Sequence, residues 1–134
     1  MEIYTDGAYS FSKDQMGIGV AVIDNGKLKK EYSRMIKGGT NNIAELLAII
    51  TALRCIKESV QSITIISDSM YCIGTITKGW KRNKNTRMWK RFDEQYEYTS
   101  KLCSNIEFKH IKGHNGNEWN EYCDFLATSA SNRI

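Results

Sequence analysis

Four acidic residues stand at positions from which carboxylates can act together on one ligand. Asp6 and Asp68 each follow a short segment of strand-like composition, while Glu45 and Asp124 lie in segments whose apolar residues recur at helical spacing. In an open α/β sheet, the carboxyl ends of neighbouring strands line the ligand crevice. We therefore expect Asp6 and Asp68 to meet there if their strands are neighbours. Helices packed over that edge can bring the other two carboxylates to the same place.

Carboxylates crowded in this way repel one another and raise one another's pKa unless a cation compensates their charge. Oxygen ligands without a thiolate are those that Mg²⁺ and Mn²⁺ prefer. The cysteines do not compete for this role, because they are widely separated and match no zinc-ligand spacing. We interpret them as reduced thiols, mostly in the core: Cys55, Cys72, Cys103 and Cys123.

Each carboxylate also has a purely structural explanation. Asp6 can start an Asp-Gly turn, Asp68 can cap the following helix, and Glu45 can pair with Asn42 in a capping box. Asp124 can be a solvent-facing helix residue. For any one of them alone the structural explanation is the better one, and only their conjunction favours a shared site.

Strand and helix signals follow one another along the chain in the order βββαβααβα. The Asn25-Gly26 pair is a strong hairpin signal, and Gly38-Gly39 marks the change from a period of two to a helical period. This order predicts an α/β protein with a mixed sheet flanked by helices. We expect strands at Met1–Thr5, Gly17–Ile23, Lys27–Ile36, Ile63–Ile66 and Ile106–Ile111, and helices beginning at Ile43, Ser69, Thr86 and Asn117.

Length and composition indicate a single domain over residues 1–134. The chain is 41% hydrophobic and 25% charged, as is ordinary for a globular protein. No window approaches the roughly 18 consecutive apolar residues of a membrane span. The start of the chain lacks the basic and apolar regions of a secretory signal. We therefore expect a cytoplasmic protein that does not associate with membranes.

The formal net charge of +4 is unevenly distributed. The segment Lys78–Arg91 holds seven basic residues and no acidic one, so the remaining chain is net negative. A basic segment of this kind attracts phosphate backbones, and its Trp80 and Trp89 can add stacking or cation–π contacts. The alternative is a solvated helix face with buried tryptophans.

Four motifs occur in one order: YTDGAY at residues 4–9, TNNIAEL at 40–46, ISDSMY at 66–71 and IKGHNGNEWNEYCDFLA at 111–127. Together they span nearly the whole chain, and the sequence resembles the ribonuclease H family, type 1. The resemblance implies an RNase H-like α/β fold, with a five-stranded mixed sheet of three antiparallel and then two parallel strands, flanked by helices. It also implies an endonuclease that hydrolyses the RNA strand of RNA–DNA hybrids.

The resemblance also implies roles for individual residues. Asp6, Glu45, Asp68 and Asp124 fall on the family's metal-binding carboxylates, and His114 falls on its auxiliary histidine. Two Mg²⁺ ions per site are implied, with Mn²⁺ as a possible substitute. The products would carry 5′-phosphate and 3′-hydroxyl ends.

Substrate contacts follow from the same resemblance. Residues implied to read 2′-hydroxyls and the minor groove are Gly7, Ala8, Asn41, Asn42 and Glu45, although the two asparagines can instead cap a helix. Thr40 and Asn85 are implied to hold a phosphate of the DNA strand, and Trp80 to stack on a DNA sugar. From the charge of the basic segment, we expect its residues to lie along the DNA strand as well, among them Lys81, Arg82, Lys84 and Arg87. Only Trp80 to about Asn85 separates the two middle helices, so the basic handle of many members is absent or reduced to a turn. Lys37 stands before Gly38-Gly39, where many members have arginine.

Two other readings remain open at this point. A noncatalytic nucleic-acid-binding module on the same fold would have little reason to keep all four carboxylates. A related polynucleotidyl transferase is disfavoured by His114 and by the motif at 40–46. We expect a monomer, and no partner polymerase is indicated.

Overall fold

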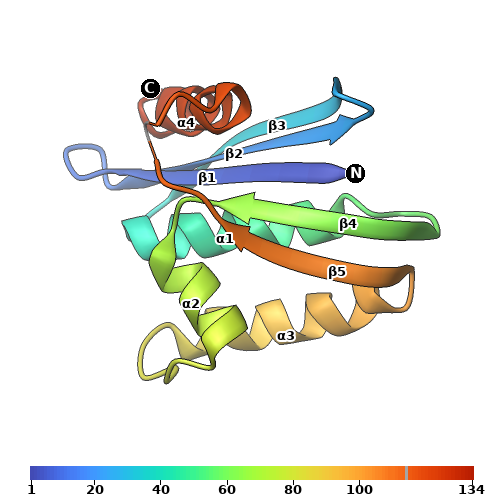
Figure 1. The fold of residues 1–134 in the computed structure, drawn as a ribbon. Coiled ribbons are helices and arrows are strands. Elements are labelled where there is room, and N and C mark those ends of the chain that lie inside the picture. The colour runs from blue at the N-terminus through green and yellow to red at the C-terminus, as the bar shows by residue number, and fades with distance from the viewer. Residues whose placement is uncertain (114) are drawn as a thin grey trace.

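The computed structural model describes residues 1–113 and 115–134. Its sheet has five strands, β1 (Glu2–Ser10), β2 (Gln15–Asp24), β3 (Lys27–Lys37), β4 (Val60–Ser67) and β5 (Cys103–His110). They lie in the order β3-β2-β1-β4-β5 (Figure 1). β1 pairs antiparallel with β2, and β2 with β3, whereas β4 runs parallel to both β1 and β5. The predicted mixed sheet is confirmed.

Four helices cover the two faces of this sheet: α1 (Asn41–Arg54), α2 (Met70–Lys78), α3 (Thr86–Ser100) and α4 (Glu118–Ser131). The larger core joins α1, α2 and α3 to one face, and α1 buries Leu46, Ile49 and Leu53 in it. α4 packs on the other face, where Cys123 joins a second, smaller cluster with Tyr4. The sheet is therefore the middle of three layers.

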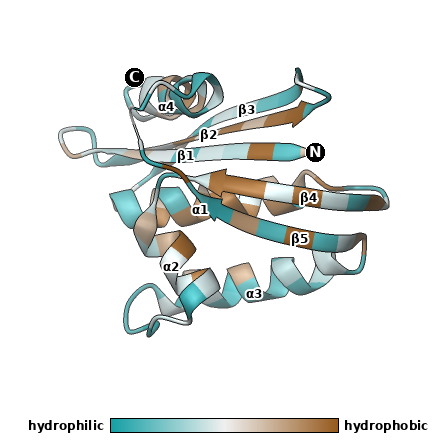
Figure 2. Cartoon of the chain, in the orientation of Figure 1, coloured by the Kyte–Doolittle hydropathy of each residue, from teal (hydrophilic) through white to brown (hydrophobic). Residues whose placement is uncertain are grey.

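β2 shows why a central strand carries apolar residues on both faces. Ile18 and Val20 belong to the larger core, whereas Ala21 and Ile23 belong to the α4 cluster. In Figure 2, hydrophobic colour marks stretches of β2 and β4, and the visible side of α3 is largely hydrophilic. The simple alternation expected of a half-buried strand is lost where helices cover both faces.

Turn and cap chemistry confirm some sequence predictions and correct others. Asn25 and Gly26 both have positive φ between β2 and β3, as the predicted hairpin requires. The N-cap of α1 is Thr40, whose hydroxyl accepts the Ile43 amide at 3.2 Å, so the predicted capping box of Asn42 and Glu45 is wrong.

Two further structural explanations are also wrong. The Asp6-Gly7 dipeptide makes no turn, because β1 continues to Ser10 and Asp6 pairs with Gly19 in β2. The expected end of this strand at Thr5 was therefore too early: long-range pairing outweighs the local turn signal of an Asp-Gly pair. The cap of α2 is Ser69, not Asp68.

The cysteines are free, as expected. Cys72, Cys103 and Cys123 are buried, and Cys55 is half-buried. Within residues 1–113 and 115–134, no helix has the length and apolar character needed to cross a membrane.

Candidate active site

The site lies where the parallel pairing of β1 and β4 ends. Thr5 is the last residue of β1 paired with β4, and its partner Ser67 is the last residue of β4. Asp6 and Asp68 are therefore the next residues along two adjacent parallel strands. The sequence predicted that these carboxylates would meet, and they do.

Glu45 reaches the same place from α1. One ligand oxygen from each of Asp6, Glu45 and Asp68 lies within 4.8 Å of those of the other two. We call these three residues the carboxylate cluster. Asp6 and Glu45 are buried, with 4% and 7% exposure, while Asp68 is half-buried. Segments far apart in the sequence thus supply one compact group of oxygen ligands.

One backbone amide holds two of these carboxylates. The Gly7 N–H donates to Glu45 Oε1 at 2.6 Å and to Asp6 Oδ1 at 2.9 Å. A Cβ at Gly7 would overlap the backbone of Ala44 and Glu45, so only glycine lets α1 approach the strand this closely. Sequence analysis missed this role for Gly7, although the Asp-Gly dipeptide was the available signal.

Burial is the main cause of the electrostatic character of the cluster. It raises the pKa of both Asp6 and Glu45, because a buried carboxylate loses hydration. The charges of Asp68 and Asp124 further raise the pKa of Asp6, and the charge of Asp6 further raises that of Glu45. Binding of protons or of a cation would therefore stabilise the cluster, because either reduces the repulsion between its buried carboxylates. All-oxygen donors at this spacing fit a hard divalent cation.

Asp124 approaches from α4, on the opposite face from α1. It is half-buried, and its charge acts on Asp6. Among the described residues, however, the group within 4.8 Å comprises only the carboxylate cluster, so Asp124 stands outside it. The structure brings three of the four predicted carboxylates into direct proximity and places the fourth within electrostatic reach.

The loop before α4 also reaches the cluster. A Cβ at Gly113 would lie 2.7 Å from Asp68 Oδ2, so this glycine sits against the carboxylate. His114, the predicted auxiliary histidine, lies outside the described residues.

The residues expected to read the minor groove differ in exposure: Gly7 and Glu45 are buried, and the others are accessible to different degrees. Asn41 and Asn42 form the exposed first turn of α1, one turn before Glu45. Ala8 is half-buried on β1, two residues after Asp6. Thr40 is exposed, but its hydroxyl already accepts the Ile43 amide as the helix cap.

Most of the predicted DNA-strand residues lie in residues 79–85, which join α2 to α3; Arg87 lies in the first turn of α3, and Thr40 lies apart from them as the cap of α1. Trp80 is 44% exposed, and Lys78 Nζ lies 5.7 Å from the centre of its ring. All seven basic residues of Lys78–Arg91 are exposed, Lys81, Lys84 and Arg87 among them.

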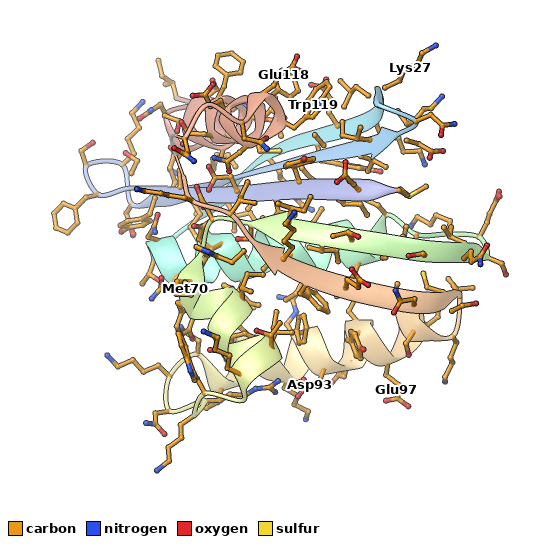
Figure 3. The ribbon with its side chains drawn as sticks, viewed as in Figure 1. Lys27, Met70, Asp93, Glu97, Glu118 and Trp119 are labelled. Carbon is orange, nitrogen blue, oxygen red and sulfur yellow. The ribbon has the colours of Figure 1, made fainter. Side chains whose placement is uncertain are left out.

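Arg82 differs from these three. It forms a 2.6 Å salt bridge with Asp93 and lies 4.8 Å from the centre of the Trp89 ring. Figure 3 shows Asp93, with Glu97, on the side of α3 that points away from the sheet. Arg82 is therefore held against the protein by an acidic residue of the next helix.

The other tryptophan of the basic segment is part of the core. Trp89 is 1% exposed, and its ring nitrogen donates to Tyr71 Oη at 2.9 Å. Asn85 Nδ2 donates to the same oxygen at 3.0 Å. The predicted nucleic-acid stacking by Trp89 is wrong, because the ring is enclosed, while Trp80 stays accessible.

Comparison with known proteins places this geometry in a family. The family model for RNase H matches residues 1–132. The chain belongs to the ribonuclease H family. A ribonuclease H from Desulforamulus reducens is 36% identical over 138 residues, covering 96% of this chain and 86% of that relative. A ribonuclease H from Syntrophomonas wolfei is 37% identical, covering 96% of this chain and 93% of the other.

Solved structures of ribonucleases H share the fold. LC11-RNase H1 in complex with an RNA/DNA hybrid has a TM-score of 0.78 and 27% identity, covering 96% of this chain and 94% of that chain. RNase H1 from the archaeon Halobacterium salinarum has a TM-score of 0.78 and 23% identity, covering 96% and 95%, which supports the fold alone. Relatives named as enzymes and the shared fold make this chain an enzyme of that family.

Proposed function

We propose that this protein is an endoribonuclease that hydrolyses the RNA strand of RNA–DNA hybrids at a site for two divalent cations. The observation that carries the proposal is the carboxylate cluster, three acidic oxygens within 4.8 Å of one another, in a chain of the ribonuclease H family. The complex of LC11-RNase H1 with an RNA/DNA hybrid supports the substrate class. We treat residues 1–134 as one catalytic domain.

The donor set fits Mg²⁺, with Mn²⁺ as a substitute, because it is all carboxylate and partly buried. When bound, two such cations supply an activated water and neutralise the charge that grows on the phosphate and the leaving 3′-oxygen. We assign Asp6, Glu45, Asp68 and Asp124 to holding these cations: Asp6 would serve both, Asp124 the one nearer the nucleophile, and Glu45 and Asp68 the one nearer the leaving group. Hydrolysis with the water on the Asp124 side would leave 5′-phosphate and 3′-hydroxyl ends.

The protein's own groups prepare the site for this reaction. The Gly7 amide orients Asp6 and Glu45 through its two hydrogen bonds. We assign His114 to moving a proton or releasing product, because an imidazole titrates near neutral pH.

Selection of RNA needs contacts with the 2′-hydroxyl, which distinguishes RNA from DNA. The amides of Asn41 and Asn42 are exposed beside the cluster, and we assign this reading to them together with the backbone at Gly7 and Ala8 and with Glu45. Because the Gly7 N–H already donates to two carboxylates, its main task in the proposal is to hold them.

We assign the DNA strand to the segment between α2 and α3. Trp80 offers an exposed ring for a sugar, and Lys81, Lys84 and Arg87 offer exposed charges for phosphates. Thr40 and Asn85 are assigned to one DNA phosphate. Arg82 belongs to the same segment, but its salt bridge to Asp93 lowers its expected share.

A cleavage assay on a labelled RNA–DNA hybrid, in Mg²⁺ and then in Mn²⁺, tests the proposal. We expect cleavage of the RNA strand with 5′-phosphate ends, and no cleavage of double-stranded RNA or DNA. Asp68→Asn should abolish cleavage and leave hybrid binding nearly intact, whereas Glu97→Gln, an exposed carboxylate on α3, should behave as the wild type. Hybrid binding without cleavage would favour the noncatalytic module, and strand transfer without hydrolysis would favour the transferase.

A further inference from the structure

Asp124 depends on a different packing contact from the other three carboxylates. The carboxylate cluster is supplied by β1, the end of β4, and α1, whereas Asp124 is supplied by α4 on the other face. α4 lies across the antiparallel half of the sheet in Figure 1. The distance between this helix and the sheet therefore determines how far Asp124 stands from the cluster.

Gly19 lies where β2 and α4 approach each other closely, beside Cys123, which is next to Asp124 in sequence. It is the residue of β2 directly opposite Asp6. A Cβ at Gly19 would overlap the backbone oxygen of Cys123 and come within 2.8 Å of Leu126 Cβ. The backbone oxygen belongs to the helix ladder and cannot rotate away as a side chain can. Relieving the overlap requires roughly 1 Å of separation between helix and strand.

A second observation locates the same turn of α4 over β1. Cys123 Sγ donates to the Tyr4 carbonyl oxygen at 3.3 Å, two residues before Asp6. Cys123, whose carbonyl touches Gly19, is the residue directly before Asp124. The charge of Asp124 acts on Asp6, so the two carboxylates lie within electrostatic reach of each other.

We propose that Gly19 is a positioning residue that sets the height of Asp124 above the sheet and so the geometry of cation binding on the Asp124 side of the site. This inference rests on the proposed function and adds a residue to it. Gly19 touches neither substrate nor cation. It acts through the backbone of Cys123, and its contribution is the absence of a side chain.

The first test is Gly19→Ala. Because a misplacement of about 1 Å can cost about a hundredfold in rate, we expect kcat to fall roughly ten- to a hundredfold, with KM for the hybrid nearly unchanged. Titration of Mn²⁺ in the absence of nucleic acid, followed by electron paramagnetic resonance, should show weaker binding than in the wild type. This second readout does not depend on activity.

A longer acid should compensate for the displaced helix. As a single substitution, Asp124→Glu should extend the carboxylate about one methylene beyond its position in the wild type and so lower both kcat and Mn²⁺ affinity. In the Gly19→Ala background, the same change should restore part of both. A residue with a merely structural role would show no such recovery.

Leu126→Ala is the matched control. Leu126 is buried on α4 with 6% exposure, and its truncation destabilises the protein by leaving a cavity, without pushing the helix from the sheet. Its thermal midpoint should fall, while kcat and Mn²⁺ affinity stay near wild type, and Asp124→Glu should give no recovery in its background.

Three outcomes would overturn the proposal: wild-type kcat and Mn²⁺ affinity in Gly19→Ala, losses no larger than those of Leu126→Ala at an equal thermal midpoint, or no recovery with Asp124→Glu. If Gly19→Ala does not fold, Gly17→Ala carries the test, since a Cβ there overlaps the Ala127 oxygen one turn further along α4. The same losses and the same recovery are then expected. If the wild type fails to cleave hybrids, the proposed function fails, while the Mn²⁺ titrations still decide the role of Gly19.

Discussion

The carboxylate cluster and the basic segment Lys78–Arg91 carry opposite charge and are built in opposite ways. The cluster gathers Asp6, Glu45 and Asp68 from distant parts of the chain into partly buried positions. The basic segment is continuous in sequence and largely exposed. The difference teaches that charge density along a sequence and charge density in space are separate properties. Folding leaves fewer groups of the basic segment available for binding, whereas it brings the carboxyl groups of the cluster together.

Folding reduces the capacity of the basic segment to bind nucleic acid in two ways. Arg82 is paired with Asp93, and Trp89 is enclosed in the core. Folding gathers the three carboxyl groups of the cluster within 4.8 Å of one another, and their burial raises the pKa of Asp6 and Glu45. Loss of one cluster member should therefore cost far more than loss of one basic residue.

The largest expected effect is at the centre of the cluster. Asp6→Asn removes the charge of the carboxylate that the proposal shares between two cations, and we expect the cleavage rate to fall at least about a thousandfold, equivalent to about 4 kcal/mol. Single-turnover cleavage of a labelled hybrid measures the rate, and filter binding checks that the hybrid is still bound. A variant that cleaves at more than a tenth of the wild-type rate would contradict the assignment of Asp6.

A smaller effect is expected from the exposed lysines of the basic segment. Lys81→Ala combined with Lys84→Ala should weaken hybrid binding roughly tenfold near 0.1 M salt and flatten the slope of log K against log salt by nearly two, since each phosphate contact contributes just under one. Cleavage at saturating substrate should hardly change. Fluorescence anisotropy over a salt series measures both quantities, and an unchanged slope would show that neither lysine contacts phosphate.

Stability should respond to pH through the cluster. Burial raises the pKa of Glu45 and Asp6, so the metal-free folded protein retains protons that the unfolded chain releases above about pH 4. The contribution to stability is fully present below that value and is lost as pH rises toward the raised pKa values. Metal-free Glu45→Gln should therefore melt several degrees above the wild type at pH 8, with little difference near pH 4.

Thermal unfolding in a chelator, followed by circular dichroism at both pH values, measures this effect. The side-chain amide in Glu45→Gln keeps an oxygen that can accept the Gly7 N–H. Addition of Mg²⁺ should stabilise the wild type at pH 8 more than the variant. A wild type that melts higher at pH 8 than the variant would show that burial does not dominate the charge balance at Glu45.

The smallest effect is expected at Arg82. Because this side chain is already paired with Asp93, Arg82→Ala should weaken hybrid binding less than Lys84→Ala does, by about twofold or less. Anisotropy titrations of the two variants under one salt condition make the comparison. Asp93→Ala frees Arg82 and should tighten binding slightly. If Arg82→Ala lost more hybrid affinity than Lys84→Ala, the expectation that the salt bridge reduces the contribution of Arg82 would be contradicted.

Much of the fold could be predicted from local patterns. The Asn25-Gly26 hairpin and the order of strands and helices were confirmed, because turn chemistry and apolar period are local properties. The end of the first strand could not be predicted from local patterns, because the pairing of Asp6 with Gly19 continues β1 through a dipeptide that by itself favours a turn. The cap at Thr40 was missed for a similar reason: Asn42 and Glu45 have capping-box spacing, but Glu45 turns inward to Gly7.

The sequence by itself determined the family, through motifs spread over nearly the whole chain, and the identities of the four acidic residues. The tertiary structure alone decided what surrounds these residues and the others that the sequence singled out. It enclosed Trp89, paired Arg82 with Asp93, and gave one Gly7 amide to two carboxylates. The physical reason is that burial, charge pairing and close backbone approach arise between segments distant along the chain. Their strength depends on separations of a few ångströms that no local pattern records.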